Sequence, residues 1–334
     1  MQPIDTLARP LKALRISVTD RCNFRCGYCM PKDVFGPDYP FLPRQDLLTF
    51  EEITRLVRTF TSLGVAKVRL TGGEPLLRRE LPALTRMLAA LPGLQDLALT
   101  TNGVLLPGLA PALREAGLKR VTVSLDTLRP DRFHALSDTD LPLSRVLEGI
   151  EAAGAAGYGP LKLNCVLQRG VNEDEILDLA AFAREAGHTL RFIEFMDVGT
   201  TNGWRLEAVV PAAEVHRRIH AQWPLEPVPV PEGAVAREWR YTDGKGEVGL
   251  IASVTMPFCR DCDRARISAD GRLYTCLFAG QGLDLRGFLR AGHSDADLAS
   301  LLASHWKRRE DRYSELRRAD TPGLPRVEMS RIGG

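Results

Sequence analysis

Six of the seven cysteines fall into two groups of three, and each group has the close spacing typical of metal or cluster ligands. The first group is C-x3-C-x2-C, formed by Cys22, Cys26 and Cys29 in the segment TDRCNFRCGYCM. Thiolates this close in sequence must lie on one loop around one centre. They suit a [4Fe–4S] cluster whose fourth iron is open to a small molecule, since a cluster held entirely by protein needs four cysteines. Zinc with a distant fourth ligand, or three unrelated buried cysteines, are the alternatives.

The second group, Cys259, Cys262 and Cys276, has the spacing C-x2-C-x13-C. By spacing alone it looks like three-quarters of a zinc ribbon, and a second [4Fe–4S] cluster with an open iron is the other interpretation. Arg264 and Arg266 closely follow the middle cysteine. Guanidinium groups bind phosphates in bidentate fashion, which a structural zinc loop does not require. The pattern therefore favours an anionic ligand beside this group.

Further basic residues lie in or at the edges of expected strands, where a cation is costly unless an anion is buried with it. Each of them alone is better explained by a side chain that ends in solvent or pairs with an acidic residue. All five together with Arg264 and Arg266 favour an anion site. They are Arg15, Lys67, Arg69, Lys162 and Arg191.

These side chains must be positioned by a strand–helix alternation that runs from about residue 12 to about residue 196. Short apolar runs bounded by turn residues predict six strands, and helices with glycine C-caps are expected between them. Six βα units predict a parallel sheet, open or curled toward a barrel, with fewer units than the eight of a closed barrel. The strands are expected at Leu14–Val18, Lys67–Leu70, Asp96–Thr100, Arg120–Leu125, Leu161–Leu167 and Leu190–Phe195, and the helices at Phe50–Leu63, Arg79–Leu91, Pro107–Ala116, Leu143–Ala156 and Glu173–Ala186.

The pattern changes after the sixth strand. Pro224–Pro231 (PLEPVPVP) predicts an extended, semi-rigid spacer. The mixed charges of Lys307–Arg318 predict a solvated helix face. Between these two segments we expect a hairpin of Val235–Tyr241 and Val248–Val254 around DGKG, and helices at Leu285–Arg290 and Ala296–Trp306.

Polar or soft residues stand at the C-terminal ends of several expected strands, where open α/β folds and barrels place their chemistry. Thr71–Pro75 reads TGGEP, and glycines there let the backbone approach a ligand closely. TTNG at Thr100–Gly103 and SLD at Ser124–Asp126 end the third and fourth strands, and Met196 in FIEFM ends the sixth. Any one of these could be a plain turn or core residue, but their recurrence favours a site at this edge.

Composition sets limits on the class of protein. The 334 residues are 44% hydrophobic and 26% charged, an ordinary globular balance that excludes collagen, a disordered tail and a disulfide miniprotein. The apolar runs are too short for a transmembrane helix, and Met1–Leu14 lacks the apolar region of a secretory signal, so a cytoplasmic protein is expected. A formal net charge of +2 argues against a broadly basic nucleic-acid surface.

The first cysteine group, with the aromatic Tyr28 before its last cysteine, resembles the motif of the radical S-adenosylmethionine superfamily. Within it, the chain from about residue 11 to its end resembles the family of GTP 3′,8-cyclases, also called molybdenum cofactor biosynthesis protein A. The resemblance is carried by TGGEP, TTNG, SLD, FIEFM, the second cysteine group with its RAR sequence, and the terminal Gly333-Gly334. This ordered set is far more specific than any one motif.

The resemblance implies an α/β fold, a partial (βα)6 TIM-like barrel with a C-terminal α+β iron–sulfur domain closing its open side. The barrel would span residues 1–198, the C-terminal domain residues 199–324, and a tail ending in Gly-Gly residues 325–334. It also implies conversion of GTP to (8S)-3′,8-cyclo-7,8-dihydroguanosine 5′-triphosphate in molybdenum cofactor biosynthesis. In that reaction a 5′-deoxyadenosyl radical removes the ribose 3′ hydrogen.

The resemblance also implies roles for individual residues. Cys22, Cys26 and Cys29 would hold a first [4Fe–4S] cluster that binds S-adenosylmethionine, and the second cysteine group a second [4Fe–4S] cluster that binds GTP. Gly333 and Gly334 would enter the channel and act in catalysis. Contacts to S-adenosylmethionine would come from Tyr28, Gly73, Ser124 and Met196, and contacts to GTP from Arg15, Lys67, Arg69, Thr100, Lys162, Arg191, Arg264, Ala265 and Arg266.

Partners and competing functions complete the expectations. GTP is the expected substrate, with an external one-electron donor and neither membrane nor nucleic acid as partner. A homodimer and hand-over of the product to a pyranopterin-forming enzyme are left open. A radical enzyme that modifies peptides is an alternative, although its usual accessory domain has more cysteines than remain here. A zinc-stabilised nucleic-acid module is a second alternative, which the nearly neutral charge opposes.

Overall fold

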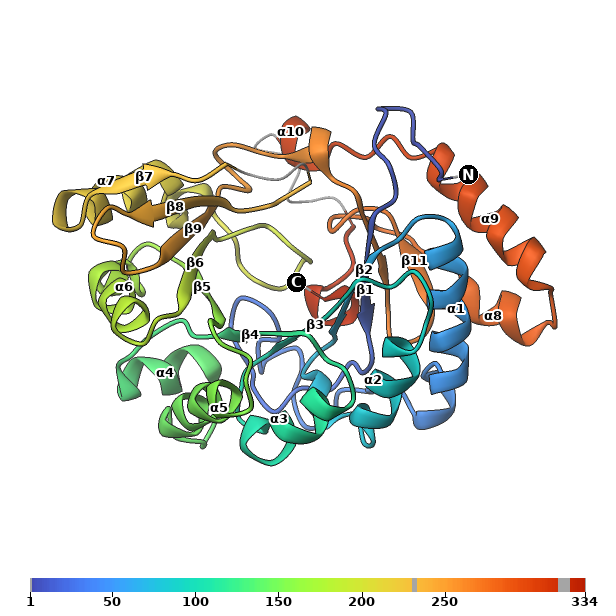
Figure 1. Ribbon diagram of the computed structural model, residues 1–334, viewed down its shortest axis with the longest axis horizontal. Helices are drawn as coiled ribbons and strands as arrows, with labels where there is room; N and C mark the ends of the chain where they lie inside the picture. The colour runs from blue at the N-terminus through green and yellow to red at the C-terminus, as the bar shows by residue number, and fades with distance from the viewer. Residues whose placement is uncertain (1, 230–232, 318–324, 334) are drawn as a thin grey trace.

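A computed structural model, which describes residues 2–229, 233–317 and 325–333, shows one curved sheet of twelve strands. Its order is β12-β11-β10-β1-β2-β3-β4-β5-β6-β9-β8-β7. The eight central strands, from β10 to β9, run parallel, and the two outer pairs are antiparallel hairpins. Because β12 and β7 are not paired with each other, the sheet stays open, and the expected partial barrel is confirmed (Figure 1).

The six expected βα units are present along the first part of the chain. The helices lie on the convex outside of the curved sheet, as Figure 1 shows for α1, α2, α3, α5 and α6. Their elements are β1 (Ala13–Ser17), α1 (Phe50–Ser62), β2 (Lys67–Thr71), α2 (Leu81–Ala89), β3 (Asp96–Thr101), α3 (Leu106–Glu115), β4 (Arg120–Ser124), α5 (Ser144–Ala155), β5 (Lys162–Leu167), α6 (Ile176–Glu185) and β6 (Thr189–Glu194).

Helix α1 illustrates how the sequence sets these elements. Thr49 and Glu52 form a capping box, in which each side chain accepts a hydrogen bond from the other residue's backbone N–H. One face of the helix buries Ile53, Leu56, Val57 and Phe60 against the sheet. The cap determines where the helix starts, and the apolar residues determine which face of the helix packs against the sheet.

The C-terminal strands extend the same sheet at both of its edges. Strand β10 (Arg264–Ile267) pairs in parallel with β1, and β9 (Glu247–Ile251) pairs in parallel with β6. The hairpin partners are β8 (Arg237–Tyr241) beside β9 and β11 (Arg272–Tyr274) beside β10. The outermost strands are β12 (Leu283–Asp284) and β7 (Leu225–Pro227). The expected hairpin around DGKG is confirmed, whereas the first residues of the Pro-rich spacer form the edge strand β7.

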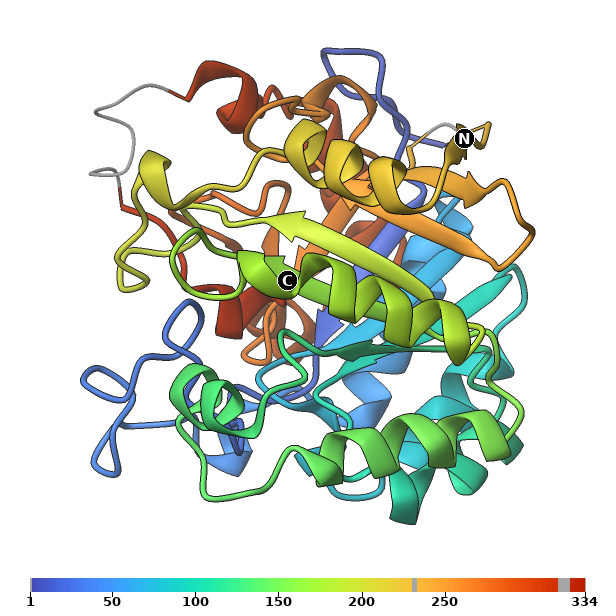
Figure 2. The ribbon, with the colours of Figure 1, turned by 90° about the vertical axis from the view of Figure 1, so that its left-hand side faces the viewer.

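Several of the remaining helices pack on the outer elements already described, as α9 (Asp295–Lys307) does on α1 and α7 (Ala212–Gln222) on α6. The last helix of the chain lies inside the curve (red in Figures 1 and 2), where it packs near β1. Among the described residues, no helix has the length and apolar character needed to cross a bilayer. The remaining α-helices are α4 (Pro130–Ser137), α7 (Ala212–Gln222), α8 (Leu285–Arg290), α9 (Asp295–Lys307), α10 (Tyr313–Leu316) and α11 (Met329–Ile332).

One prediction from charge patterning was wrong. The run that begins at Lys307 was expected to be a solvated helix face, but Arg309 within it is buried, with 4% of its surface exposed. Its guanidinium forms ion pairs with Asp5 and Asp311, and its Nη1 atom donates to the carbonyl of Cys262. The nearby carboxylates therefore allow Arg309 to be buried, and the charge pattern of the sequence does not show which arginine is paired in this way.

Candidate functional site

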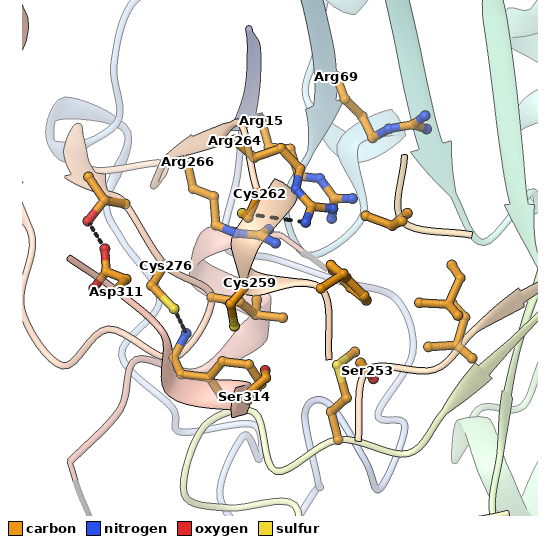
Figure 3. A pocket seen from close by; sticks show the side chains of 18 of the residues that line it. Arg15, Arg69, Ser253, Cys259, Cys262, Arg264, Arg266, Cys276, Asp311 and Ser314 are labelled. Carbon is orange, nitrogen blue, oxygen red and sulfur yellow. Dashed lines mark hydrogen bonds between the residues drawn. The ribbon is translucent and has the colours of Figure 1, made fainter. Parts of the chain in front are cut away.

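A cavity of about 180 Å³ lies on the concave side of the sheet, beside the second cysteine group (Figure 3). Figure 3 shows the side chains of Arg15, Arg69 and Arg264 directed toward it, with Cys259 and Cys276 at its wall. Six of the predicted GTP contacts line it, together with all three cysteines of the second group and Met196. Those six are Arg15, Arg69, Thr100, Arg191, Arg264 and Arg266.

Strand register explains why the arginines meet. Arg15 on β1 stands opposite Arg69 on β2 and opposite Arg266 on β10, and all three strands are parallel. Side chains alternate between the two faces of a strand, so Arg264 shares a face with Arg266. Arg15, Arg69, Arg264 and Arg266 therefore point from three adjacent strands to one side of the sheet.

This arginine cluster is partly shielded from solvent, with Arg266 buried and Arg15, Arg69 and Arg264 half-buried. Within the parts of the chain that the structure describes, no carboxylate forms an ion pair with Arg15, Arg69, Arg264 or Arg266. Burial, reinforced by the neighbouring guanidinium groups, lowers the pKa of Arg15 well below its usual value. Burial and nearby arginines also lower the pKa of Arg69 and of Arg266 to about 10 each. A polyanion in this cavity would relieve both the desolvation and the repulsion.

The other predicted GTP residues lie elsewhere or are already paired. Lys162 Nζ lies 3.6 Å from Glu238 Oε1, and Arg191, which does line the cavity, also donates to that oxygen. The alternative of pairing with an acidic residue therefore holds for both. Lys67 is exposed at the start of β2, and Ala265 is buried within β10. Neither side chain is part of the cavity wall.

Two arginines that were not predicted from the sequence donate hydrogen bonds to backbone carbonyls of the second cysteine group. Arg9 Nη1 donates to the carbonyl of Cys259 at 2.7 Å, and Arg309 Nη1 donates to that of Cys262 at 2.6 Å. Both guanidinium groups pair with the buried carboxylate of Asp5, and both line the cavity. Arg9 stands in an N-terminal segment without any motif, so only the three-dimensional structure reveals it.

The thiols of the second group differ in their electrostatic surroundings. Burial would raise the pKa of Cys262, but Arg264 and Arg309 outweigh it and lower that pKa to about 6. Burial, followed by repulsion from Asp311, raises the pKa of Cys276 to about 12. Cys262 is thus held as a thiolate near neutral pH, the form in which cysteine binds metals.

The first cysteine group lies on the loop that follows β1. The backbone N–H of Phe24 points at Cys22 Sγ, 3.4 Å away, and Cys29 N–H donates to the carbonyl of Cys26 at 2.9 Å. Burial, followed by repulsion from the neighbouring thiols, raises the pKa of Cys26 well above its usual value. Burial and then Glu74 raise the pKa of Cys22 to about 12. Three unpaired thiols are thus gathered in a poorly solvated loop.

The TGGEP loop packs directly on this cysteine loop, and its glycines make that possible. A Cβ atom on Gly72 would lie 2.4 Å from the carbonyl oxygen of Thr19, and one on Gly73 would lie 2.3 Å from that of Arg21. Both distances are far inside van der Waals contact, so larger residues are excluded. The Gly73 N–H donates to the Thr19 carbonyl at 3.0 Å. The glycines therefore serve first to bring the two loops together.

The other predicted S-adenosylmethionine residues lie on the first cysteine loop and at the ends of strands β4 and β6. Tyr28 donates its hydroxyl to Asp126 Oδ2 at 2.8 Å, which ties the cysteine loop to the SLD motif. Ser124 is the last residue of β4. Met196 follows β6 and lines the cavity beside the second group. Asp126 had no predicted role, although its SLD motif had been noted.

The C-terminal tail contacts both the RAR sequence and the TGGEP loop. Arg266 donates a hydrogen bond to the carbonyl of Gly333, and a Cβ atom on Gly333 would lie 2.2 Å from Thr71 Cγ2. Gly333 thus sits between the RAR sequence and the TGGEP loop, with φ at +68°. Gly334, the other predicted catalytic glycine, lies outside the described residues.

The donor sets fit iron–sulfur clusters. All six cysteines of the two groups are free thiols, and soft thiolate ligands select such clusters. Cluster binding would remove the proton from each thiol whose pKa burial has raised. Among the described residues, no three His, Cys, Asp or Glu side chains are arranged to hold a single metal ion.

Two family models match consecutive parts of the chain. Residues 16–183 match the family described as "Radical SAM superfamily", and residues 188–315 match "Molybdenum Cofactor Synthesis C". The chain is 56% identical to the GTP 3′,8-cyclase of Acidothermus cellulolyticus over 360 residues, covering 100% of this chain and 99% of the relative. It is 48% identical to that of Aquifex aeolicus, covering 99% of each.

A solved structure supports the fold independently. Streptococcus suis SuiB bound to S-adenosylmethionine superposes with a TM-score of 0.61 at 16% identity, covering 97% of this chain and 78% of SuiB. At this identity the likeness concerns the fold alone. Identity near one half over full length is a much stronger relation, and it extends through both matched regions. The chain therefore belongs to the GTP 3′,8-cyclase family of the radical S-adenosylmethionine superfamily.

Proposed function

We propose that this chain converts GTP to (8S)-3′,8-cyclo-7,8-dihydroguanosine 5′-triphosphate, the reaction for which its relatives are named, in molybdenum cofactor biosynthesis. One observation carries the proposal at the level of side chains. Arg15, Arg69, Arg264 and Arg266 converge, half-buried or buried and without a carboxylate partner among the described residues, on a cavity that is also lined by a cysteine triad. A nucleoside triphosphate would supply negative charge for this cluster, and the triad lines the same cavity.

The arginines bind and orient the triphosphate. Arg69 Nη1 is already held by the hydroxyls of Thr100 and Thr122, at 3.0 and 3.1 Å, so little side-chain entropy is lost when it binds an anion. Arg15 and Arg266 meet the same ligand from the neighbouring strands. Fixing GTP at its charged end keeps the ribose in one place, which matters when a reactive radical must meet a single hydrogen.

We assign one [4Fe–4S] cluster to each cysteine triad, the first with S-adenosylmethionine and the second with GTP. A bound cluster and S-adenosylmethionine supply the 5′-deoxyadenosyl radical that removes the ribose 3′ hydrogen. Gly73, Ser124 and Met196 would contact S-adenosylmethionine from the strand ends, and Tyr28 would do so from the cysteine loop. Lys67, Lys162, Arg191 and Ala265 remain predicted GTP contacts by resemblance.

The tail would act at the centre of the site. Gly333 is held by Arg266, one of the proposed triphosphate ligands, and touches Thr71 beside the proposed S-adenosylmethionine contacts. In this position the tail excludes water from the space between the two substrates. A cytoplasmic location, an external electron donor, a homodimer and hand-over of the product to a pyranopterin-forming enzyme also remain predictions.

Isotope transfer tests the reaction directly. The anaerobically reconstituted protein is incubated with S-adenosylmethionine, a reductant and GTP that carries deuterium at the ribose 3′ position. We expect deuterium in the 5′-deoxyadenosine and a cyclised nucleotide as the second product. GTP labelled at the 2′ position is the matched control and should leave 5′-deoxyadenosine unlabelled. Unlabelled 5′-deoxyadenosine from the 3′ substrate, or turnover without a cyclised nucleotide, would refute the proposal.

A further inference from the structure

A second hollow, separate from the cavity described above, opens on the outer surface beside the first cysteine loop. It has a volume of about 820 Å³ and lies where four segments meet: the chain before Cys22, the residues around the start of α1, the segment that follows the TGGEP loop and the start of α2. We name it the arginine groove after the four residues that dominate its lining, Arg21, Arg44, Arg78 and Arg79.

The groove is cationic and its arginines are not neutralised. Glu51 and Glu80 also line it, so its charged lining residues carry two more positive than negative charges. None of the four arginines forms an ion pair within the described residues. Other arginines near the surface do form ion pairs, as the half-buried Arg55 does with Asp295 and the exposed Arg120 with Asp96. The groove therefore presents positive charge at the protein surface that can interact with a negatively charged partner.

Two of these guanidinium groups are held in place by their surroundings. Arg78 lies over the ring of Phe50, with 5.2 Å to the ring centroid, and donates to the carbonyl of Leu48 at 2.9 Å. Arg21 lies over the ring of Phe41 at 5.3 Å. Pre-ordered cations lose less entropy on binding than mobile ones. Leu77, 38% exposed, adds an apolar contact in the same groove.

The groove shares its wall with the first cysteine group. Arg21 is the chain neighbour of Cys22, so their Cα atoms are about 3.8 Å apart. The Arg21 carbonyl accepts the N–H of Glu74 at 2.8 Å, and Thr19, which also lines the groove, accepts that of Gly73. One layer of backbone thus separates the groove from the proposed cluster site. In Figure 2 the blue segment that follows β1 projects from the body of the molecule on this side.

We propose that the arginine groove is the docking surface for a small acidic electron-carrier protein that reduces the first cluster. The inference rests on the proposed function, because that reaction needs an electron from outside the chain. In the docked complex one electron passes from the reduced carrier to the cluster held by Cys22, Cys26 and Cys29. The carrier is oxidised by one electron, the cluster is reduced by one, and no bond forms or breaks in this step. Opposite charge on the carrier steers it to the groove and sets its orientation.

The test uses the reconstituted holoenzyme and a flavodoxin as the acidic probe. The test variant is Arg44→Glu with Arg79→Glu, two exposed groove residues that contact neither cysteine group. The control variant is Arg58→Glu with Arg217→Glu, which makes the same change in net charge at exposed positions on α1 and α7. Calorimetry gives the Kd for flavodoxin at about 20 and about 200 mM salt. Stopped-flow absorbance then compares cluster reduction by reduced flavodoxin with reduction by dithionite, which needs no docking surface.

In the test variant we expect the flavodoxin Kd at low salt to rise by about tenfold or more, with flavodoxin-driven reduction slowed accordingly. The control variant should stay within about twofold of the wild type, and dithionite should reduce all three proteins alike. Unchanged flavodoxin affinity and reduction rate in the test variant would overturn the docking proposal. Equal loss in both variants would do the same, because it would reflect net charge alone. Failure of the proposed function would look different, since turnover would then be absent with dithionite too.

Discussion

The guanidinium of Arg266 donates a hydrogen bond to the main-chain carbonyl of Gly333, which lies 67 residues further along the chain. Arg266 belongs to the arginine cluster, so the tail is anchored on a group that is also a proposed triphosphate ligand. The tail and the substrate therefore share one cation. We therefore expect changes in the tail to lower the turnover rate more than they lower the stability of the fold.

Replacement of Gly333 by alanine tests this relation. The new Cβ would lie 2.2 Å from Thr71 Cγ2, and the residue would have to keep a φ of +68°, which side chains other than hydrogen resist. We expect turnover to fall by about tenfold or more, while iron content and the unfolding temperature stay close to the wild type. Gly154→Ala is the control, since a Cβ there meets nothing within 4 Å and the site is helical. Full activity of Gly333→Ala would show that the tail geometry is irrelevant.

Deletion of both terminal glycines should have the same signature, with intact folding and cluster content and suppressed product. The measurement is product yield per chain together with iron analysis of the same sample. Loss of iron along with activity would instead mean that the tail has a structural role.

Arg69→Gln should weaken GTP binding. The substitution removes a half-buried charge that faces the cavity but leaves a polar group near Thr100 and Thr122. A hydrogen bond to a charged group is worth about 1.5–3 kcal/mol, so the Kd for GTP should rise by about tenfold to a hundredfold. Arg120→Gln on the nearby strand β4 is the control, because Arg120 is paired with Asp96 and 44% exposed. If the two variants had the same Kd for GTP, Arg69 would not be a GTP ligand.

Cys22→Ala should remove one cluster and leave the other. Two [4Fe–4S] clusters correspond to about eight irons per chain, and the variant should retain about four. Cys165→Ala serves as the control, because Cys165 is fully buried in β5, as expected for a small core residue, and belongs to neither group. Iron and sulfide analysis, with the absorbance of the brown chromophore, gives the answer. An unchanged iron content in Cys22→Ala would contradict ligation at this position.

His188 should contribute to the pH dependence of stability. Burial lowers the pKa of His188 below its usual 6.5, and its Nδ1 atom is buried without a hydrogen-bond partner in the described part of the chain. Between the lowered folded-state pKa and 6.5 the unfolded chain binds more protons, so stability falls as pH drops through this range. His188→Gln should lose less stability than the wild type between about pH 7 and about pH 5.5. Urea unfolding of both proteins checks this, and parallel curves would contradict it.

Periodicity and glycine caps were sufficient to predict the six βα units, whereas the partial barrel was implied by the family resemblance. All six strands and five helices of the βα units lie within a few residues of their expected positions, because burial on one face imposes a clear pattern. Helix α4 was missed, since eight residues with a weak apolar face leave little signal. The edge pairing of β9 and β10 was also missed, because contacts between distant segments leave no local pattern.

The candidate site was predictable where its chemistry is clustered in sequence. Both cysteine groups and the RAR sequence are local, and strand register then brings Arg15 and Arg69 beside them. Arg9 and Arg309 could not be found in this way, because each acts through a carbonyl far away in the chain. The pairing of Lys162 with Glu238 likewise depends on a hairpin that reaches the sheet from the C-terminal region.

The pairing of β10 with β1 has a consequence for biosynthesis. Ala13 of β1 pairs on its outer side with Arg264 of β10, about 250 residues later in the chain. In the same way, β6 pairs on its outer side with β9, which is also synthesised later. Until the ribosome has delivered those segments, the nascent barrel carries two open flanks of unsatisfied main-chain groups, which invite association with other chains. A truncated gene that stops after β6 should therefore yield inclusion bodies rather than a smaller barrel, and the full-length protein should reach its native sheet only after translation is nearly finished.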